Sequence, residues 1–188
     1  MDSAALAIER SQPDLIGAAM AGDKSAFDLL VRQHARQVFR LALRMLGNRE
    51  DAEDVQQETF VRAHQRLRSF RGECSFGTWL YAIASRLCLS ARRRRAAMRE
   101  ENIAGDPADG SSVNEDIEQK IVAQESARRV QRSLLALSPP DRLLIVLRYI
   151  EGLSHAEIAR VVGCSVESSR SRLARAKRLF RQQYERME

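Results

Sequence analysis

Apolar side chains recur at steps of three and four residues along most of this chain, and this spacing restricts the fold more than any other feature. Such steps place the apolar side chains on one face of a helix, whereas a half-buried strand needs strict alternation. No segment of the sequence alternates over the length of a strand. The sequence therefore predicts an all-α fold whose helices pack together through their apolar faces.

Three helices are predicted in the first half of the chain. The first starts at Asp23 and ends before Gly47, because glycine suits the left-handed backbone that closes a helix. The second covers residues 49–67, and the third covers about residues 78–94, after a loop that contains two glycines. Residues 1–20 show little pattern, so we expect a partly disordered extension there.

Charge divides the chain into three blocks. Residues 1–99 carry 17 basic and 11 acidic side chains, and residues 128–188 carry 13 basic and six acidic ones. Between them, residues 100–127 carry eight acidic side chains and one basic one. The two basic blocks favour binding to a polyanion such as nucleic acid, whereas the acidic block should avoid it.

Helical periodicity is lost at residues 96–116, among glycine, proline, serine and acidic residues. This composition is typical of a flexible linker. We therefore expect two small helical domains joined by a flexible acidic linker. The expected order is an N-terminal extension at 1–21, a first domain at 22–95, the linker at 96–127 and a second domain at 128–184.

The second domain contains the pattern of a helix-turn-helix. Ser154 and Glu157 have the spacing of a capping box at the start of a short helix. Gly163 suits the turn that follows, and Ser165 can cap the next helix. That second helix is rich in arginine, as expected of a helix that enters the major groove of DNA. The alternative is a basic, solvated surface helix without a ligand.

An acidic segment at residues 50–58 packs five carboxylates into nine positions. On a helix, Asp51, Asp54 and Glu58 fall on one face, and this crowding of like charges indicates a cationic partner surface. A merely solvated acidic face is the alternative. A catalytic or metal site has little support, because no histidine cluster or nucleophile motif accompanies the carboxylates.

Aromatic residues lie among small and basic ones between Phe70 and Tyr81, and four arginines follow at 92–95. Aromatic faces next to cations suit single-stranded DNA, because bases stack on the rings while the cations hold the phosphates. The alternative is that Phe76 and Trp79 simply belong to the core. We expect Trp79 to be at least partly buried and Tyr81 to be exposed.

The cysteines and the apolar runs argue against several other classes of protein. Cys74, Cys88 and Cys164 are too few and too scattered for a disulfide framework, and none lies in a CxxC or Cys/His cluster that would indicate zinc. No apolar run approaches the roughly 18–20 residues of a membrane span, and the N-terminus lacks the features of a signal peptide. We expect a cytoplasmic protein without a metal or other cofactor.

Four segments together resemble extracytoplasmic-function (ECF) sigma factors, which are promoter-specificity subunits of bacterial RNA polymerase. Residues 22–34, 48–67 and 70–87 (GDKSAFDLLVRQH, NREDAEDVQQETFVRAHQRL and FRGECSFGTWLYAIASRL) are similar to region 2 of that family. Residues 137–181 (LSPPDRLLIVLRYIEGLSHAEIARVVGCSVESSRSRLARAKRLFR) are similar to its region 4. The order and spacing of the segments agree, and the resemblance covers most of the chain.

The resemblance implies roles for individual positions. Binding to the β′ clamp helices of core RNA polymerase, which also contains the β subunit, is implied for Asp51, Asp54, Gln57, Glu58 and Phe60. Binding to the melted minus-ten element, with a flipped base held by the loop 70–75, is implied for Phe70, Arg71, Ser75, Thr78, Trp79, Tyr81, Ser85, Arg86, Arg92 and Arg93. Recognition of the minus-thirty-five duplex is implied for Ser168, Arg170, Ser171, Arg172, Arg175 and Lys177.

The family further implies partners and a role without catalysis. Sigma factors direct core polymerase to promoters and help to melt them, while phosphodiester synthesis belongs to the core. ECF members serve stress responses and are commonly held by an anti-sigma factor. The expected partners are therefore core polymerase, promoter DNA and an anti-sigma factor. A stand-alone helix-turn-helix transcription regulator is the second hypothesis, although it leaves the acidic and aromatic segments unexplained.

Two positions in the second helix of the helix-turn-helix depart from the family pattern. Ser169 stands where valine is usual, on the inward side, and Glu167 stands where a small residue is frequent. An acid near the groove repels phosphate or accepts a hydrogen bond from a cytosine amine. These departures leave the fold expectation unchanged, but they prevent a prediction of the minus-thirty-five bases.

Overall fold

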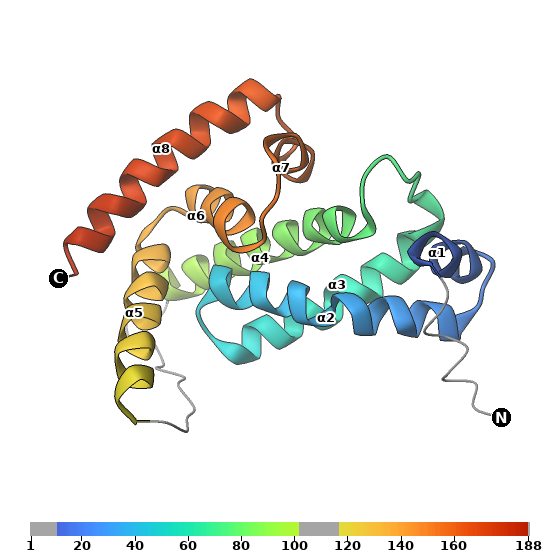
Figure 1. Cartoon of the computed structure of the whole chain (residues 1–188), viewed down its shortest axis with the longest axis horizontal. Helices are drawn as coiled ribbons and strands as arrows, with labels where there is room; N and C mark the ends of the chain where they lie inside the picture. The colour runs from blue at the N-terminus through green and yellow to red at the C-terminus, as the bar shows by residue number, and fades with distance from the viewer. Residues whose placement is uncertain (1–10, 102–116, 188) are drawn as a thin grey trace.

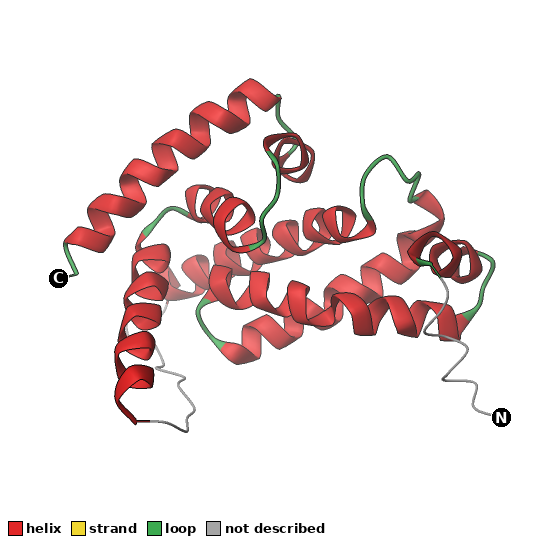
Figure 2. Cartoon of the chain, viewed as in Figure 1, coloured by secondary structure: helices red, strands yellow, loops and turns green. Residues whose placement is uncertain are grey.

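The computed structural model describes residues 11–101 and 117–187, with side chains described for residues 11–94 and 125–187. These residues form helices joined by short loops, without strands, as Figure 2 shows. The all-α prediction is therefore confirmed. In chain order the helical elements are α1 (Gln12–Met20), α2 (Lys24–Leu46), α3 (Arg49–Arg66), η1 (Leu67–Ser69), α4 (Phe76–Glu101), α5 (Ile117–Ala136), α6 (Pro139–Ile145), η2 (Val146–Ile150), α7 (His155–Val162) and α8 (Val166–Glu185).

Helices α2, α3 and α4 form the first bundle, and local sequence sets their ends. The side chain of Asp23 caps α2 by accepting a hydrogen bond from the Ala26 N–H at 3.2 Å. Gly47 ends α2 with a φ of 85°, in the left-handed region that glycine tolerates. Asn48 then caps α3 by accepting from the Asp51 N–H at 2.8 Å. The predicted first and second helices are thus confirmed.

Helix α1 packs on α2 where the sequence predicted a partly disordered extension. Leu15 is fully buried, and the amide of Gln12 meets the ring of His34, with the two Nε2 atoms 2.7 Å apart. The expectation is therefore wrong for residues 12–20, while residues 1–10 lie outside the described part of the chain. A nine-residue helix is unstable by itself, so α1 depends on packing that its own sequence pattern does not reveal.

Helical structure also enters the segment predicted as a linker. Helix α4 continues to Glu101, although we expected it to end near Arg94, and α5 begins at Ile117. Residues 95–101 consist of arginine, alanine, methionine and glutamate, which all favour helix, so nothing local stops α4. The rest of the predicted linker, residues 102–116, lies outside the described residues.

The C-terminal half contains the predicted helix-turn-helix. Ser154 and Glu157 make the reciprocal hydrogen bonds of a capping box at the start of α7. Gly163 closes α7 with a φ of 70°, and Ser165 caps α8 by accepting from the Ser168 N–H at 3.1 Å. Helix α8 lies along the outer edge of the molecule, at the upper left of Figure 1. The predicted helix pair and its turn are therefore confirmed.

The two halves of the chain are docked through α2 and α4 on one side and α5, α6 and α7 on the other (Figure 1). Arg142 is fully buried in this contact. Its guanidinium donates to the carbonyls of Leu134 and Leu135 at 2.7 and 2.6 Å, and to the carbonyl of Met45 near the end of α2. Burial lowers the pKa of Arg142 to about 10, so the side chain stays charged at neutral pH, stabilised by two helix C-termini.

Candidate nucleic-acid interfaces

Helix α8 presents a row of cations to solvent. Its buried side consists of Ser169, Leu173 and Ala176. The residues predicted to meet the minus-thirty-five duplex lie on its other sides. Ser168 and Arg172 are half-buried, and the exposed ones are Arg170, Ser171, Arg175 and Lys177. An exposed helix with cations along it fits the major groove of duplex DNA.

Arg175 differs from its neighbours because its guanidinium forms an ion pair within the protein. Its Nη2 lies 2.8 Å from Oδ1 of Asp141 in α6, while the side chain stays 60% exposed. Asp141 is itself held by Ser138, whose hydroxyl donates to Oδ2 at 2.6 Å. This ion pair fixes α8 against α6, and sequence reasoning missed it because the two residues are distant in the chain.

Ser169 and Glu167, the two unusual positions of α8, lie on different sides of the helix. Ser169 is fully buried, and its hydroxyl has no hydrogen-bond partner among the described residues. Glu167 is exposed in the first turn. The inward position of Ser169 agrees with the prediction, and its unpaired hydroxyl costs folding free energy.

The aromatic residues before and within α4 form one cluster. The ring centroid of Phe70 lies 5.6 Å from that of Phe76 and 5.4 Å from that of Trp79. Phe76 is buried, whereas Phe70 and Trp79 are half-buried, so the core and binding interpretations each hold in part. Arg71, next to Phe70 in the sequence, is exposed. Partly exposed rings beside a cation can accept a stacked base.

Thr78, Tyr81 and Ser85 of α4, which were predicted to hold the melted strand, are only 3%, 6% and 2% exposed. We call these three residues the strand face. The expectation that Tyr81 is exposed is wrong, because Tyr81 meets the C-terminal half of the chain. Its hydroxyl donates to Oε2 of Glu151 at 2.5 Å, and burial together with this hydrogen bond raises the pKa of Tyr81. Just before the strand face, Ser75 is exposed and accepts from the Thr78 N–H at 3.1 Å.

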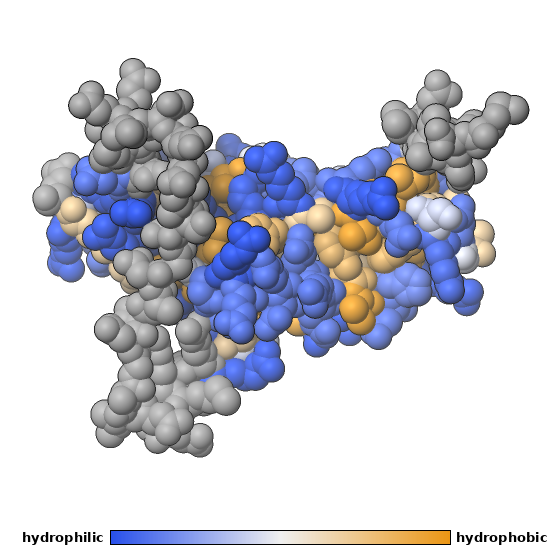
Figure 3. Space-filling view, turned by 90° about the horizontal axis from the view of Figure 1, so that it is seen from below, coloured by the Kyte–Doolittle hydropathy of each residue, from blue (hydrophilic) through white to orange (hydrophobic). Residues whose placement is uncertain are grey.

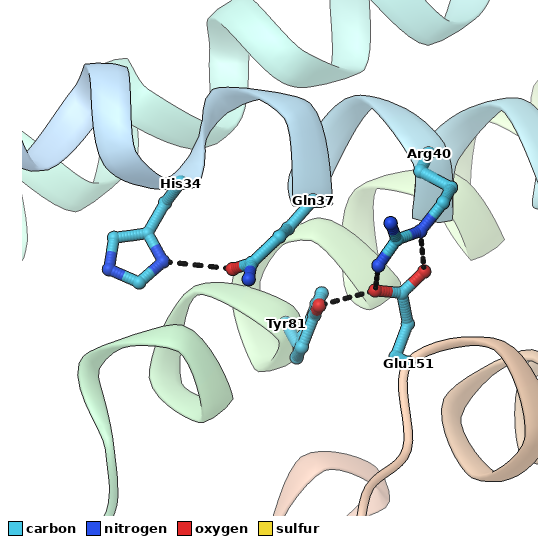
Figure 4. A network of polar contacts seen from close by, with 5 residues as sticks. All are labelled: His34, Gln37, Arg40, Tyr81 and Glu151. Carbon is cyan, nitrogen blue, oxygen red and sulfur yellow. Dashed lines mark hydrogen bonds and ion pairs between the residues drawn. The ribbon is translucent and has the colours of Figure 1, made fainter.

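Glu151 joins the two halves through the network in Figure 4. Arg40 of α2 donates to both carboxylate oxygens, with Nε to Oε1 at 2.8 Å and Nη2 to Oε2 at 2.6 Å. The Glu151 side chain is fully buried, whereas the Arg40 side chain is 42% exposed. The hydrogen bond to Glu151 raises the pKa of Arg40, as expected of a bidentate ion pair. Sequence reasoning missed this network, since Glu151 lies 70 residues from Tyr81 and 111 residues from Arg40 in the chain.

Arginines from both halves line a hollow of about 420 Å³ between the aromatic loop, α4 and α7. Arg66 and Arg86 come from the N-terminal half, and Arg160 comes from α7. All three residues are exposed. Further along α4, Arg93 is exposed and Arg92 is half-buried. The predicted minus-ten cations are therefore accessible, although the strand face beside them is covered.

The acidic helix α3 borders an apolar groove of about 650 Å³ between α2 and α3. Gln57 and Phe60, both predicted to bind polymerase, line the groove together with Val31 and Val61, and Val61 is 50% exposed. Figure 3 shows a hydrophobic area bordered by hydrophilic side chains on this face of the molecule. Sequence reasoning missed the groove, although apolar side chains spaced along both helices could have indicated it.

The carboxylates of α3 differ in how free they are to meet a partner. Asp54 is exposed. Asp51 accepts a hydrogen bond from the amide of Asn48 at 2.6 Å, and Glu58 accepts one from Arg62 at 2.6 Å. Within the described part of the chain, no group of three or more histidine, cysteine, aspartate or glutamate residues is arranged to hold a metal ion. Helix α3 therefore carries an exposed negative charge at Asp54.

The three cysteines carry free thiols. Burial raises the pKa of Cys88 to about 12, and burial likewise raises the pKa of Cys74. Both thiols are therefore protonated and weakly nucleophilic at neutral pH. As for membranes, the described helices include none long and apolar enough to span one.

Two sigma-factor families match the chain in the predicted order. Residues 30–98 match Sigma-70 region 2, and residues 127–180 match Sigma-70 region 4. A curated relative, the ECF RNA polymerase sigma-E factor of Haemophilus influenzae, is 35% identical over 175 residues. This similarity covers 88% of the present chain and 91% of the relative.

Solved structures share the arrangement of helices. CnrH, solved in complex with the cytosolic domain of CnrY, is similar with a TM-score of 0.65 and 29% identity, over 89% of this chain and 93% of that one. The sigma factor RpoE from Bartonella quintana, solved with the anti-sigma factor NepR, is similar with a TM-score of 0.65 and 22% identity, over 85% of this chain and 96% of that one. The second similarity supports the fold alone.

Proposed function

This chain belongs to the sigma-70 family, as a sigma factor of the ECF type, and we propose that three of its surfaces place RNA polymerase on promoters. One surface binds the core enzyme, the second holds the melted minus-ten strand and the third reads the minus-thirty-five duplex. Sigma factors are initiation factors without enzymatic activity, so the alternative of a catalytic site at the acidic segment 50–58 is set aside. The match to region 2 likewise disfavours a stand-alone regulator.

The apolar groove, which is partly formed by the acidic helix α3, is the observation that carries the proposal for core binding. Gln57 and Phe60 line the groove, and Asp51, Asp54 and Glu58 belong to the same helix. Exposed apolar surface rimmed by charge is typical of a protein interface. In this proposal the β′ clamp helices of the polymerase occupy the groove, while the carboxylates steer and orient a cationic partner surface.

The exposed side of α8 supports the proposal for the minus-thirty-five element. Arg170 and Arg172 are the side chains that we assign to base recognition, since arginine can pair bidentately with guanine. Ser168, Ser171 and Lys177 then contact the duplex around them. Arg175, which is paired with Asp141, orients the helix and adds charge toward the phosphates.

The aromatic loop and α4 support the proposal for the minus-ten element. Unstacking a base costs a few kcal/mol, and stacking on half-exposed rings can offset that cost. In this proposal the flipped base lies against Phe70 and Trp79, beside Arg71 and Ser75. The strand then follows α4 over Thr78, Tyr81, Ser85, Arg86, Arg92 and Arg93.

An anti-sigma factor is part of the proposal as a further partner. The structural relative CnrH was solved with the cytosolic domain of CnrY, and RpoE was solved with the anti-sigma factor NepR. We assign the protein to the cytoplasm, because its proposed binding partners, core polymerase and promoter DNA, are located there.

Core binding can be tested with Asp54→Ala, which removes an exposed carboxylate and should leave folding intact. We expect binding to purified core polymerase to weaken about tenfold, which corresponds to about 1.4 kcal/mol. Asp28→Ala removes the same charge from an exposed position of α2 outside the groove, and it should bind as the wild type does. Equal affinities of the two variants in fluorescence anisotropy would contradict the assignment of the acidic helix.

A further inference from the structure

The buried histidine His34 of α2 lies behind the aromatic cluster that is proposed to hold the flipped base. We infer that His34 is a positioning residue for minus-ten binding: its ring, fixed by amides from α1 and α2, sets the place of Phe76 and thereby of the two half-buried rings packed on it. This inference rests on the minus-ten role proposed above for Phe70 and Trp79. All of these residues belong to the N-terminal half of the chain.

The ring of His34 is held from two sides by side-chain amides. Nε2 of Gln12, at the start of α1, donates to Nε2 of His34 at 2.7 Å. On the other side, Nδ1 of His34 donates to Oε1 of Gln37 at 3.0 Å (Figure 4). An amide nitrogen donates and an amide oxygen accepts, so the two partners fit one neutral tautomer, with the proton on Nδ1. Burial lowers the pKa of His34, which favours this neutral ring in a single orientation.

The fixed ring of His34 lies against the beginning of α4. Its centroid is 5.4 Å from that of Phe76, the first residue of α4, in the edge-on arrangement that aromatic pairs favour. A Cβ atom placed on Gly77, the next residue, would lie 3.5 Å from Cε1 of His34 and 3.6 Å from Nδ1. The imidazole therefore packs closely on the first turn of α4.

Phe76 connects His34 to the two rings that are proposed to receive the base. It is 1% exposed, and its ring centroid lies 5.6 Å from that of Phe70 and 5.5 Å from that of Trp79. A buried ring in a close-packed interior cannot shift without moving its neighbours. A displacement of Phe76 should therefore change the surface on which a base stacks.

Helix α1 is part of this support. It supplies Gln12, and it packs on α2 and on η1, the turn that leads into Phe70 (Figure 1). The helix thereby contacts both the histidine behind the aromatic cluster and the segment that precedes the cluster. Its role in strand binding is to hold His34 in place, and this role does not require contact with DNA.

The test measures the aromatic cluster and strand binding separately, with the full chain. Trp79 is the only tryptophan of the sequence, so its emission wavelength and its quenching by acrylamide report on the cluster in the absence of DNA. Fluorescence anisotropy measures binding of the complex with core polymerase to labelled DNA pools of random sequence, single-stranded in one series and duplex in the other. Core polymerase alone is the blank.

Three variants remove the support in steps. His34→Ala removes the ring, whereas Gln12→Ala and Gln37→Ala each keep the ring and remove one amide. Val55→Ala shortens a buried side chain of α3 and controls for a general loss of stability. Gln33→Ala removes an exposed amide of α2 and is the control for the two glutamine variants.

His34→Ala should shift the Trp79 emission to longer wavelength and weaken binding to the single-stranded pool about tenfold, with no change for the duplex pool. Each glutamine variant should change both measurements in the same direction, with about a threefold loss of strand affinity. The two control variants should give the emission and the affinities of the wild type.

The glutamine variants keep the buried ring, so they test the inference even if His34→Ala does not fold. An unchanged Trp79 emission in both of them would overturn the positioning role of His34 and leave the minus-ten role of the cluster intact. A shifted emission with unchanged strand affinity would instead overturn the minus-ten role of the two half-buried rings. An equal shift in Val55→Ala and His34→Ala would assign the effect to stability alone and overturn the inference.

Discussion

The two surfaces that we propose bind nucleic acid differ in how exposed they are. The cations of α8 are exposed along the outer edge of the chain, whereas the strand face of α4 is buried between the two halves. The difference parallels the order of events at a promoter, because the minus-thirty-five duplex exists before melting and the minus-ten strand exists only after it. A surface for duplex DNA can stay open, while a surface for a melted strand is needed only later.

The packing of the two helices explains this difference. Helix α8 buries a narrow side through Ser169, Leu173 and Ala176, so its other sides face solvent. Helix α4 buries Leu80 and Ala84 and, in addition, the strand face, of which Thr78 and Tyr81 form hydrogen bonds to Glu157 and Glu151 of the second half. Substitutions that act on one surface alone can therefore test whether the two are independent.

Arg142→Ala should have the largest effect on stability, because it removes a buried side chain that connects the two halves of the chain. The buried guanidinium serves carbonyls in α5, in the turn after it and at the end of α2. Leaving these carbonyls unpaired should destabilise the protein by about 3–5 kcal/mol. Urea denaturation measures the change. Arg178→Ala, at an exposed position of α8, should have little effect, and a similar small effect for Arg142→Ala would contradict its structural role.

Arg170→Ala should weaken binding to duplex DNA without affecting binding to single-stranded DNA. We expect a loss of about 1–3 kcal/mol in binding of the polymerase holoenzyme to a minus-thirty-five duplex, if the residue pairs with a base. Binding to single-stranded minus-ten DNA should not change. Arg132→Ala, an exposed position of α5, is the matched control. A parallel loss for the control would show that only net charge matters.

Ser169→Ala tests the buried side of α8. The Ser169 hydroxyl is buried without a hydrogen-bond partner among the described residues, so its removal should stabilise the protein, by about 1 kcal/mol. Duplex binding should stay the same, because the residue does not face solvent. Thermal denaturation gives the stability change. A loss of stability would show that the hydroxyl is satisfied, for instance by water.

Acid should weaken the first turn of α7 slightly. The hydrogen bond from the Ser154 backbone, followed by that from the Ser154 hydroxyl, lowers the pKa of Glu157. The folded state therefore favours the ionised form, and this stabilisation is complete above the ordinary glutamate pKa and lost as pH falls through the lowered one. The effect should be a few tenths of a kcal/mol, because the group is partly solvated.

The pH effect can be isolated with Glu157→Gln, which keeps the capping-box geometry but removes the titrating group. Urea denaturation from neutral pH down to about pH 3 should show a shallower loss of stability in this variant than in the wild type. Identical pH profiles would assign the loss to other carboxylates.

Features that depend on neighbours in the sequence were predictable here. The end of α2 at Gly47, the capping box of Ser154 and Glu157 and the cap at Ser165 all require only local hydrogen bonds or backbone preferences. These local signals were sufficient to predict the helix-turn-helix, and the arginines of residues 166–185 were sufficient to predict the cationic side of α8. Local signals of this kind are strong because each involves residues within one helical turn.

Features that depend on docking of distant segments were not predictable. Tyr81 was expected to be exposed, but Glu151 binds it from a segment 70 residues further along the chain. Helix α1 gains its stability from α2, and the groove beside Phe60 exists because α2 and α3 pack side by side. A single sequence carries the apolar pattern of each helix but not the choice of which faces meet.

The sigma-factor role is tested most directly by run-off transcription with purified core polymerase of the native host on a library of promoter fragments. We expect promoter-specific transcripts that appear only when this protein is added, and that are reduced by Asp54→Ala and Arg170→Ala. An absence of such transcripts with correctly folded protein would contradict a sigma-factor role and favour a stand-alone DNA-binding regulator.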